Sequence, residues 1–190
     1  MVKNKNDRRY IRSKIKLEDN YLREVREQNG LVGVEAQRIC RGANVHASTF
    51  FRHYHNIRGI VNGVRLDIKL EYSRMLGRID KHGGKNRDVI YETFKFIERH
   101  GDYFETAIVV NNTMMLEWIG KKIWKRIVKT KYRYGMKRIE VVYIYELIGI
   151  MTTWIRDEKM DINKIDQYVD YVIKISSGGI SRLNLFADKE

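Results

Sequence analysis

Apolar residues recur along this chain at intervals of three and four positions, and short polar breaks separate the periodic segments. Such spacing gathers apolar side chains on one side of a helix, so it predicts amphipathic helices rather than strands. We therefore expect an all-α fold of about nine helices. The predicted helices cover about 10–28, 34–41, 46–52, 57–80, 87–100, 102–112, 114–132, 136–157 and 161–176.

The polar breaks carry residues that end or begin helices. Asn29-Gly30 is expected to end the first helix, and Asn56 to cap the fourth. The segment 82–86 is the clearest linker, and 177–179 is expected to end the last helix. Asp102 and Asp161 are expected as N-caps or first-turn acids.

The segment 34–54 predicts two short helices joined by a tight turn. Ala36, Ile39 and Cys40 have the spacing of one buried helical face, and Asn44 suits the left-handed conformation of a turn. Val45 and Phe50 are expected to pack the second helix onto the first. This layout is typical of a helix-turn-helix, whose second helix enters the major groove of DNA.

On the outward face of that second helix we expect Ser48, Thr49, Arg52 and His53. Thr49 and His53 can donate hydrogen bonds to phosphate oxygens. His46, Ala47 and Ser48 lie at the helix N-terminus, the end that typically contacts base edges. The Ser48 hydroxyl can pair with a donor or an acceptor on a base, and the Ala47 methyl group can contact the thymine methyl group. The predicted DNA-binding set is Val34, Arg38, His46, Ala47, Ser48, Thr49, Phe51, Arg52, His53 and Arg58.

Charge and composition agree with a helical DNA-binding chain. The formal net charge is +13, and residues 1–60 carry 13 Lys and Arg against 6 Asp and Glu. An excess of basic residues that coincides with a helix-turn-helix is typical of phosphate-backbone binding. The chain contains no proline, the residue that helix interiors reject most strongly. Cys40 is the only cysteine, which excludes an intrachain disulfide and, with no signal-peptide pattern, favours a cytoplasmic location.

Catalytic and metal-binding motifs are absent from the sequence. The five histidines are scattered, Cys40 stands alone, and neither a phosphate-binding glycine loop nor a G-x-S-x-G motif occurs. We therefore expect neither an enzyme nor a metal or other cofactor.

The sequence of the N-terminal region resembles those of the TetR/AcrR-type bacterial transcriptional regulators. The resemblance is carried by Gly30, by Ala43-Asn44-Val45 and by STFFRHY at 48–54, over about residues 7–66. The opening DRRYIRSK at 7–14 is most similar to the branch of the dihydroxyacetone-kinase operon regulator. The resemblance implies an all-α homodimer with a DNA-binding domain at 1–56 and a helical regulatory and dimerisation domain at 57–190. It also implies repression that a small-molecule effector relieves, although some members of that branch activate.

The C-terminal half supplies candidates for the effector and dimer surfaces. Aromatic and Met side chains line apolar pockets, but each of them equally suits a plain core. The effector candidates are Phe96, Tyr103, Phe104, Met114, Met115, Trp118, Trp124 and Tyr145. The last two helices could form half of an intermolecular four-helix bundle, or the centre of a monomer. The dimer candidates there are Tyr143, Leu147, Met151, Trp154, Ile165, Tyr168, Val169 and Val172.

A second basic block leaves an alternative function open. Residues 114–140 carry 9 Lys and Arg against 2 Asp and Glu, and Lys121, Lys125 and Lys129 form one helical stripe. Such stripes are usually solvated faces. The alternative is a helical protein-interaction module with a degenerate helix-turn-helix, which uses this stripe to bind an acidic partner.

Overall fold

The computed structural model describes residues 7–127 and 136–187, and within these ranges all regular secondary structure is helical. This confirms the all-α fold with about nine helices. The α-helices are α1 (Arg8–Glu27), α2 (Ala36–Ala43), α3 (Ala47–His53), α4 (Ile57–Lys81), α5 (Asn86–Arg99), α6 (Gly101–Val109), α7 (Met114–Ile127), α8 (Met136–Arg156) and α9 (Ile165–Ala187). A 3₁₀ turn, η1 (Ile162–Lys164), precedes α9. No helix in the described ranges combines the length and the apolar character needed to cross a bilayer.

The helix ends follow from local side chains. Asn29 and Asn44 both take the left-handed conformation, with φ of 51° each, and terminate α1 and α2 as predicted. Asp161 caps the 3₁₀ turn, its side chain accepting from the Asn163 amide at 3.0 Å. Asn56 caps α4, because its Oδ1 accepts from the Gly59 amide at 2.9 Å.

The expected end of the last helix at 177–179 is wrong, because α9 continues to Ala187. A glycine inside a helix costs about 1 kcal/mol but keeps its backbone N–H, so it weakens a helix without breaking it as proline does. The predicted extension of the seventh helix to residue 132, and with it Lys129 of the basic stripe, lies outside the described residues.

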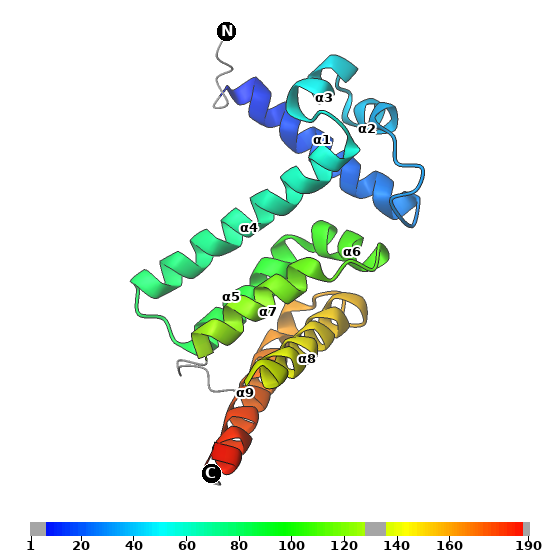
Figure 1. Cartoon of the computed structure of the whole chain (residues 1–190). Coiled ribbons are helices and arrows are strands. Elements are labelled where there is room, and N and C mark those ends of the chain that lie inside the picture. Colours follow the sequence, from blue (N-terminus) through cyan, green and yellow to red (C-terminus); the bar gives the residue numbers. More distant parts are fainter. Residues whose placement is uncertain (1–6, 128–135, 188–190) are drawn as a thin grey trace. The chain divides into compact units, whose positions relative to one another are not determined.

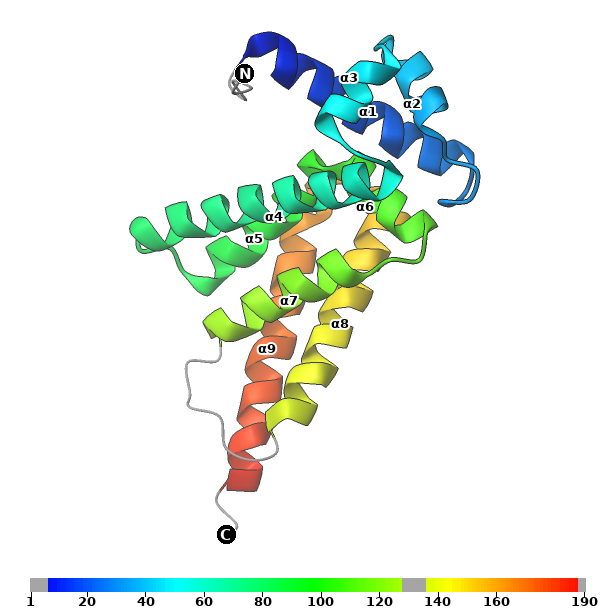
Figure 2. The same ribbon diagram turned by 45° about the horizontal axis from the view of Figure 1, so that its top comes forward.

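The first of two compact units consists of Met1–Glu71 and Glu105–Asn112. Within it α2 and α3 pack against α1 and against each other, as Figures 1 and 2 show. The fully buried side chains at its centre are Leu17, Val25, Ile39, Phe50 and Ile60, which α1 to α4 supply. Ile60, Val64 and Ile68 of α4 are buried, so the first part of this helix groups with α1 to α3. The grouping therefore differs from the boundary expected at residues 56/57.

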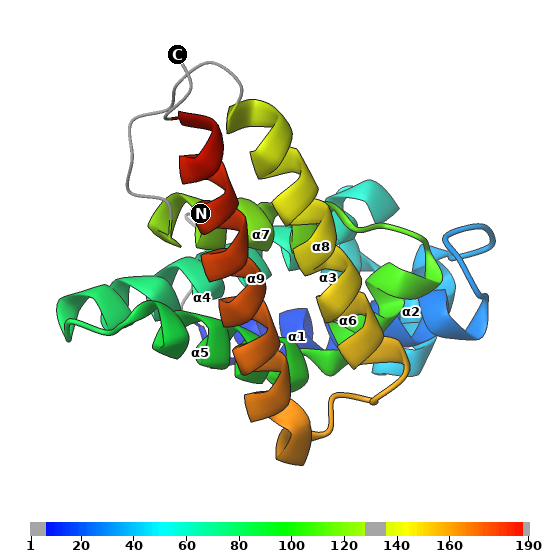
Figure 3. The same cartoon turned by 90° about the horizontal axis from the view of Figure 1, so that it is seen from below.

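The second unit consists of Tyr72–Phe104 and Thr113–Glu190. Within it α8 packs against α7 and α9, while α5 packs against α9 and α7; Figure 3 shows α8 and α9 side by side. Two buried hydroxyl pairs join its helices: Tyr72 with Thr93 at 2.9 Å, and Tyr143 with Ser176 at 2.6 Å. Burial raises the pKa of Tyr143 to about 12, so this phenol stays neutral at physiological pH.

Candidate nucleic-acid interface

Helix α3 begins at a histidine cap. The Nδ1 atom of His46 accepts a hydrogen bond from the Ser48 amide at 3.2 Å and lies 2.8 Å from the Ser48 hydroxyl. The turn before it is fixed by left-handed Asn44, and the Val45 amide donates to the Cys40 carbonyl at 3.0 Å. The start of α3 is therefore held by the cap and turn residues that directly precede it.

The two sides of α3 differ sharply in exposure. Phe50 is fully buried, and Tyr54, just after the helix, is 6 % exposed. The opposite side is open to solvent and consists of Ala47, Ser48, Phe51 and Arg52. Phe51 keeps 53 % of its surface exposed, which is unusual for an aromatic side chain on a small helix. We call these four residues the outer face of α3.

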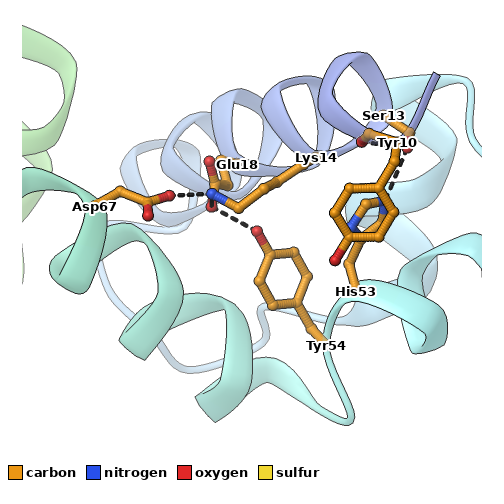
Figure 4. A network of polar contacts seen from close by, with 7 residues as sticks. All are labelled: Tyr10, Ser13, Lys14, Glu18, His53, Tyr54 and Asp67. Atoms are coloured by element: carbon orange, nitrogen blue, oxygen red, sulfur yellow. Dashed lines mark hydrogen bonds and ion pairs between the residues drawn. The ribbon is translucent and has the colours of Figure 1, made fainter. Parts of the chain in front are cut away.

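Tyr54, the residue directly after α3, connects this helix to α1 and α4 (Figure 4). Its hydroxyl donates to Glu18 of α1, and its ring lies against Gly63 of α4, where an added Cβ would come within 2.9 Å of Cε1. Burial and the bond to Glu18 raise the pKa of Tyr54, so the phenol remains a donor. A larger residue at Gly63 would displace this ring.

Lys14 completes the network between α1 and α4. Its ammonium group pairs with Glu18 at 3.1 Å and with Asp67 of α4. Burial works against the charge of Lys14, but the bonds to both carboxylates prevail and raise its pKa. Burial also raises the pKa of Glu18, although Tyr54 and Lys14 oppose that shift. The network joins the first half of α4 to α1 and to the end of α3.

The structure corrects the expected outward position of His53. The side chain is half-buried: its ring lies 4.0 Å from that of Tyr10, and its Nε2 is 2.8 Å from the Ser13 hydroxyl. Both contacts belong to α1, which a periodicity argument confined to α3 could not include. His53 therefore joins α3 to α1 in this structure (Figure 4).

The remaining predicted DNA-binding residues divide by exposure. Val34 is buried at 8 % exposure, so its side chain offers almost no surface to DNA. Arg38 is exposed, but its Nε lies 3.5 Å from Glu24, which competes with any phosphate for it. Thr49 is half-buried, whereas His46 and Arg58 are exposed at the starts of α3 and α4.

Sequence reasoning missed three exposed arginines of α1. Arg8, Arg9 and Arg12 are exposed, but the predicted DNA-binding set leaves them out because they precede the helix-turn-helix in the sequence. In the structure α1 begins at Arg8, with Asp7 as its N-cap. The contacts of Tyr10 and Ser13 with His53 bring this turn of α1 to the C-terminal end of α3. The cluster of basic residues at 8–12 was the available signal.

Most of the expected effector residues fill the core of the second unit. Phe96 and Phe104 are fully buried, and Met115 and Trp124 are each 2 % exposed. Trp118 packs edge-on against Tyr72 at 5.7 Å. Met114 and Tyr145, at 58 % and 69 % exposure, lie on the surface and do not belong to this core. Tyr103 is half-buried and contacts Phe104.

The expected dimer residues also belong to the core of one chain. All except Tyr168 are buried, and Tyr168 is half-buried beside Phe94. Amphipathic spacing identifies a face that must be covered, but it does not say whether another helix of the same chain covers it. The buried members are Tyr143, Leu147, Met151, Trp154, Ile165, Val169 and Val172.

Cys40 and the acidic side chains suggest no other chemistry. Cys40 is buried, and burial raises the pKa of its thiol, which disfavours the reactive thiolate. Within the described ranges no three His, Cys, Asp or Glu side chains gather where they could hold a metal ion.

The geometry of the first unit therefore presents one short helix with a buried and an open side, between exposed cations on α1 and α4. Comparisons with family models, with curated proteins and with solved structures find no match to this chain.

Proposed function

We propose that this protein is a sequence-specific DNA-binding transcriptional regulator of the TetR type, a repressor that acts as a homodimer and responds to a small-molecule effector. The carrying observation is the outer face of α3. Four of its residues are open to solvent, while Phe50 and Tyr54 anchor the opposite side in the core. A supported helix with one open side is what insertion into the major groove requires.

The outer face suits base recognition in its details. Ala47 offers a methyl group and Ser48 a hydroxyl at the N-terminal end of α3, where helix-turn-helix proteins approach base edges. The exposed ring of Phe51 provides apolar surface for a thymine methyl group. Burying that ring against DNA would also remove an exposed aromatic from water.

Phosphate contacts on both flanks would set the docking. Arg52 lies at the end of α3 and Arg58 in the first turn of α4, and both are exposed. The backbone N–H groups at the start of α4 favour an anion there, because the positive end of the helix dipole adds to Arg58. Arg9 and Arg12 of α1 supply further charge near the C-terminal end of α3. These groups would give affinity and register without reading sequence.

The dimer surface that we propose is the exposed side of α8. Val141, Val142 and Tyr145 are 50 %, 57 % and 69 % exposed, and Tyr145 lies one helical turn after the two adjacent valines. Gly149 follows one turn later, and an added Cβ there would meet no atom within 4 Å. A second copy of the chain would cover these apolar side chains and supply the second α3 that a two-fold operator needs.

A fragment selection followed by titration tests the DNA-binding proposal. Genomic fragments retained by the full chain are sequenced, and the enriched duplex is titrated against a random duplex at physiological salt. A specific reader binds the enriched duplex about 10³-fold or more tightly than the random one. Substitution of Ala47 or Ser48 should alter the preferred sequence, because both lie at the base-reading end of α3.

The interaction-module alternative predicts the opposite pattern. Binding would then be equal for both duplexes, insensitive to changes at Ala47 and Ser48, and reduced by Lys121→Gln or Lys125→Gln. That result would overturn the proposed function and leave the basic surface of α7 as the site of interaction.

A further inference from the structure

A hollow in the second unit belongs to neither the outer face of α3 nor the exposed side of α8. It measures about 550 Å³ and lies where the turn from α4 to α5 meets α7. This volume is within the range of small-molecule sites, roughly 300–1,000 Å³. Its lining is formed by Asp80, Gly83, Gly84, Lys85, Asn86 and Arg126.

The sequence dictates this shape at the turn. Gly83 has a φ of +69°, which favours glycine, and a Cβ on Gly84 would lie 2.3 Å from the Ile79 side chain. Two adjacent positions therefore admit no ordinary side chain without strain, and the backbone turns tightly enough to leave the hollow open.

Arg126 reaches the hollow from α7 and is only partly satisfied there. Its Nη2 donates to the Gly84 carbonyl at 2.7 Å, and its Nη1 pairs with Asp80. The Nε atom is shielded from solvent and has no hydrogen-bond acceptor among the described residues. A shielded N–H donor without an acceptor is unfavourable. A ligand that reorients the guanidinium and accepts from Nε would therefore bind more tightly.

Cations outnumber the two carboxylates, Asp80 and Asp88, around the hollow. Lys85 lines it, and Lys81 lies one residue after Asp80 on α4. The exposed Lys122 and Lys125 precede Arg126 on α7. Asp80 is the one carboxylate in the lining, and its side chain is 56 % exposed. An ion pair this exposed is weak, so an incoming anion can compete for the Arg126 guanidinium.

We propose that this hollow binds a small phosphorylated molecule, whose phosphoryl oxygens contact Lys85 and Arg126 in place of Asp80. A planar guanidinium and an ammonium group together suit a multivalent oxyanion. The Asp88 carboxylate in the first turn of α5 already accepts from the Lys85 amide at 2.6 Å, so the attraction comes from the two side chains and not from the start of that helix. The hollow is larger than a bare phosphate, so we infer that the rest of the ligand also lies in it. The inference does not depend on the proposed function.

Calorimetric titration of the full chain with pyrophosphate, at constant ionic strength, tests the site. We expect saturable binding that Lys85→Gln and Arg126→Gln each weaken about tenfold or more. Asp80→Asn should tighten binding several-fold, because it removes the competing charge. Lys125→Gln is the matched control: it removes one charge beside Arg126 but outside the lining, and should leave binding within about twofold.

Several outcomes would overturn the site. Absence of saturable binding to the wild-type chain would do so, as would equal weakening by Lys125→Gln and Lys85→Gln, which indicates diffuse charge. Unchanged or weaker binding by Asp80→Asn would contradict the exchange at Arg126. Thermal unfolding shows whether the Arg126→Gln variant is folded. Lys85 is exposed, so Lys85→Gln tests the site without disturbing the core. If duplex DNA binding depends on Lys85 and Arg126 while pyrophosphate does not bind, the ligand is the DNA backbone and our assignment is wrong.

Discussion

Tyr54 shows how one side chain supports the outer face of α3. Its ring is buried against Gly63 of α4, and its hydroxyl is bound to Glu18 of α1. The residue directly before it, His53, contacts Tyr10 and is close to Ser13 on the same helix. Two consecutive residues therefore fix the end of α3. Their substitution should lower the free energy of unfolding, whereas neither side chain needs to contact DNA.

Gly63→Ala should lower the free energy of unfolding by about 1–3 kcal/mol, since the Cβ would meet the Tyr54 ring at 2.9 Å. Gly77→Ala on the same helix is the control, because an added Cβ there meets nothing within 4 Å. The control should raise stability by roughly 0.5–1 kcal/mol, the ordinary gain of alanine over glycine in a helix. Denaturant unfolding followed by circular dichroism measures both. Equal effects of the two substitutions would contradict the contact with Tyr54.

Glu18 predicts a specific dependence of stability on pH. Its pKa in the folded chain is raised above the ordinary 4.5, mainly by burial, so the folded state holds this proton more tightly than the unfolded state does. The contribution of Glu18 is therefore greatest below pH 4.5 and declines as the pH rises through the folded pKa. Wild type should lose stability relative to Glu18→Gln as the pH rises above 4.5. A constant difference between the two would mean that the pKa of Glu18 is not raised.

At the scale of elements, local signals predicted most of the first unit. The left-handed Asn44, the buried Cys40 and the anchor Phe50 all follow from turn chemistry and helical spacing. The position of His53 does not, because Tyr10 and Ser13 are distant in sequence. Helical spacing also could not tell that Leu147 and Trp154 are covered by their own chain, which is why the predicted dimer residues proved to be core.

The turn between α2 and α3 can be tested by substitution at Asn44. This residue has φ of 51° and ψ of 52°, a conformation that costs most L-residues about 1–2 kcal/mol. Asn44→Ala should therefore destabilise the chain by about 1 kcal/mol, whereas Asn44→Gly should be neutral or slightly stabilising. Thermal unfolding of the pair provides the comparison. Equal stability of the alanine and glycine variants would indicate a different turn.

At the scale of the whole molecule, the exposed apolar side of α8 leads us to expect a dimer in solution. Tyr145→Glu places a charge in the middle of the proposed dimer surface and should shift the protein toward monomer. Leu66→Glu alters an α4 side chain of comparable exposure, 56 %, and should leave the oligomeric state unchanged. Sedimentation velocity at several concentrations distinguishes the two. A wild-type chain that remains monomeric at high micromolar concentration would exclude this dimer.

The most direct test of the central claim is the salt dependence of binding to the enriched duplex. Wild type, Arg52→Ala and Arg74→Ala are compared by fluorescence anisotropy. Arg52 flanks the outer face of α3, whereas Arg74 is an exposed arginine of α4 in the second unit. We predict that Arg52→Ala weakens binding and lowers the slope of log K against log salt by about 1, while Arg74→Ala matches wild type. Indistinguishable slopes for Arg52→Ala and wild type would contradict the placement of DNA on the outer face of α3.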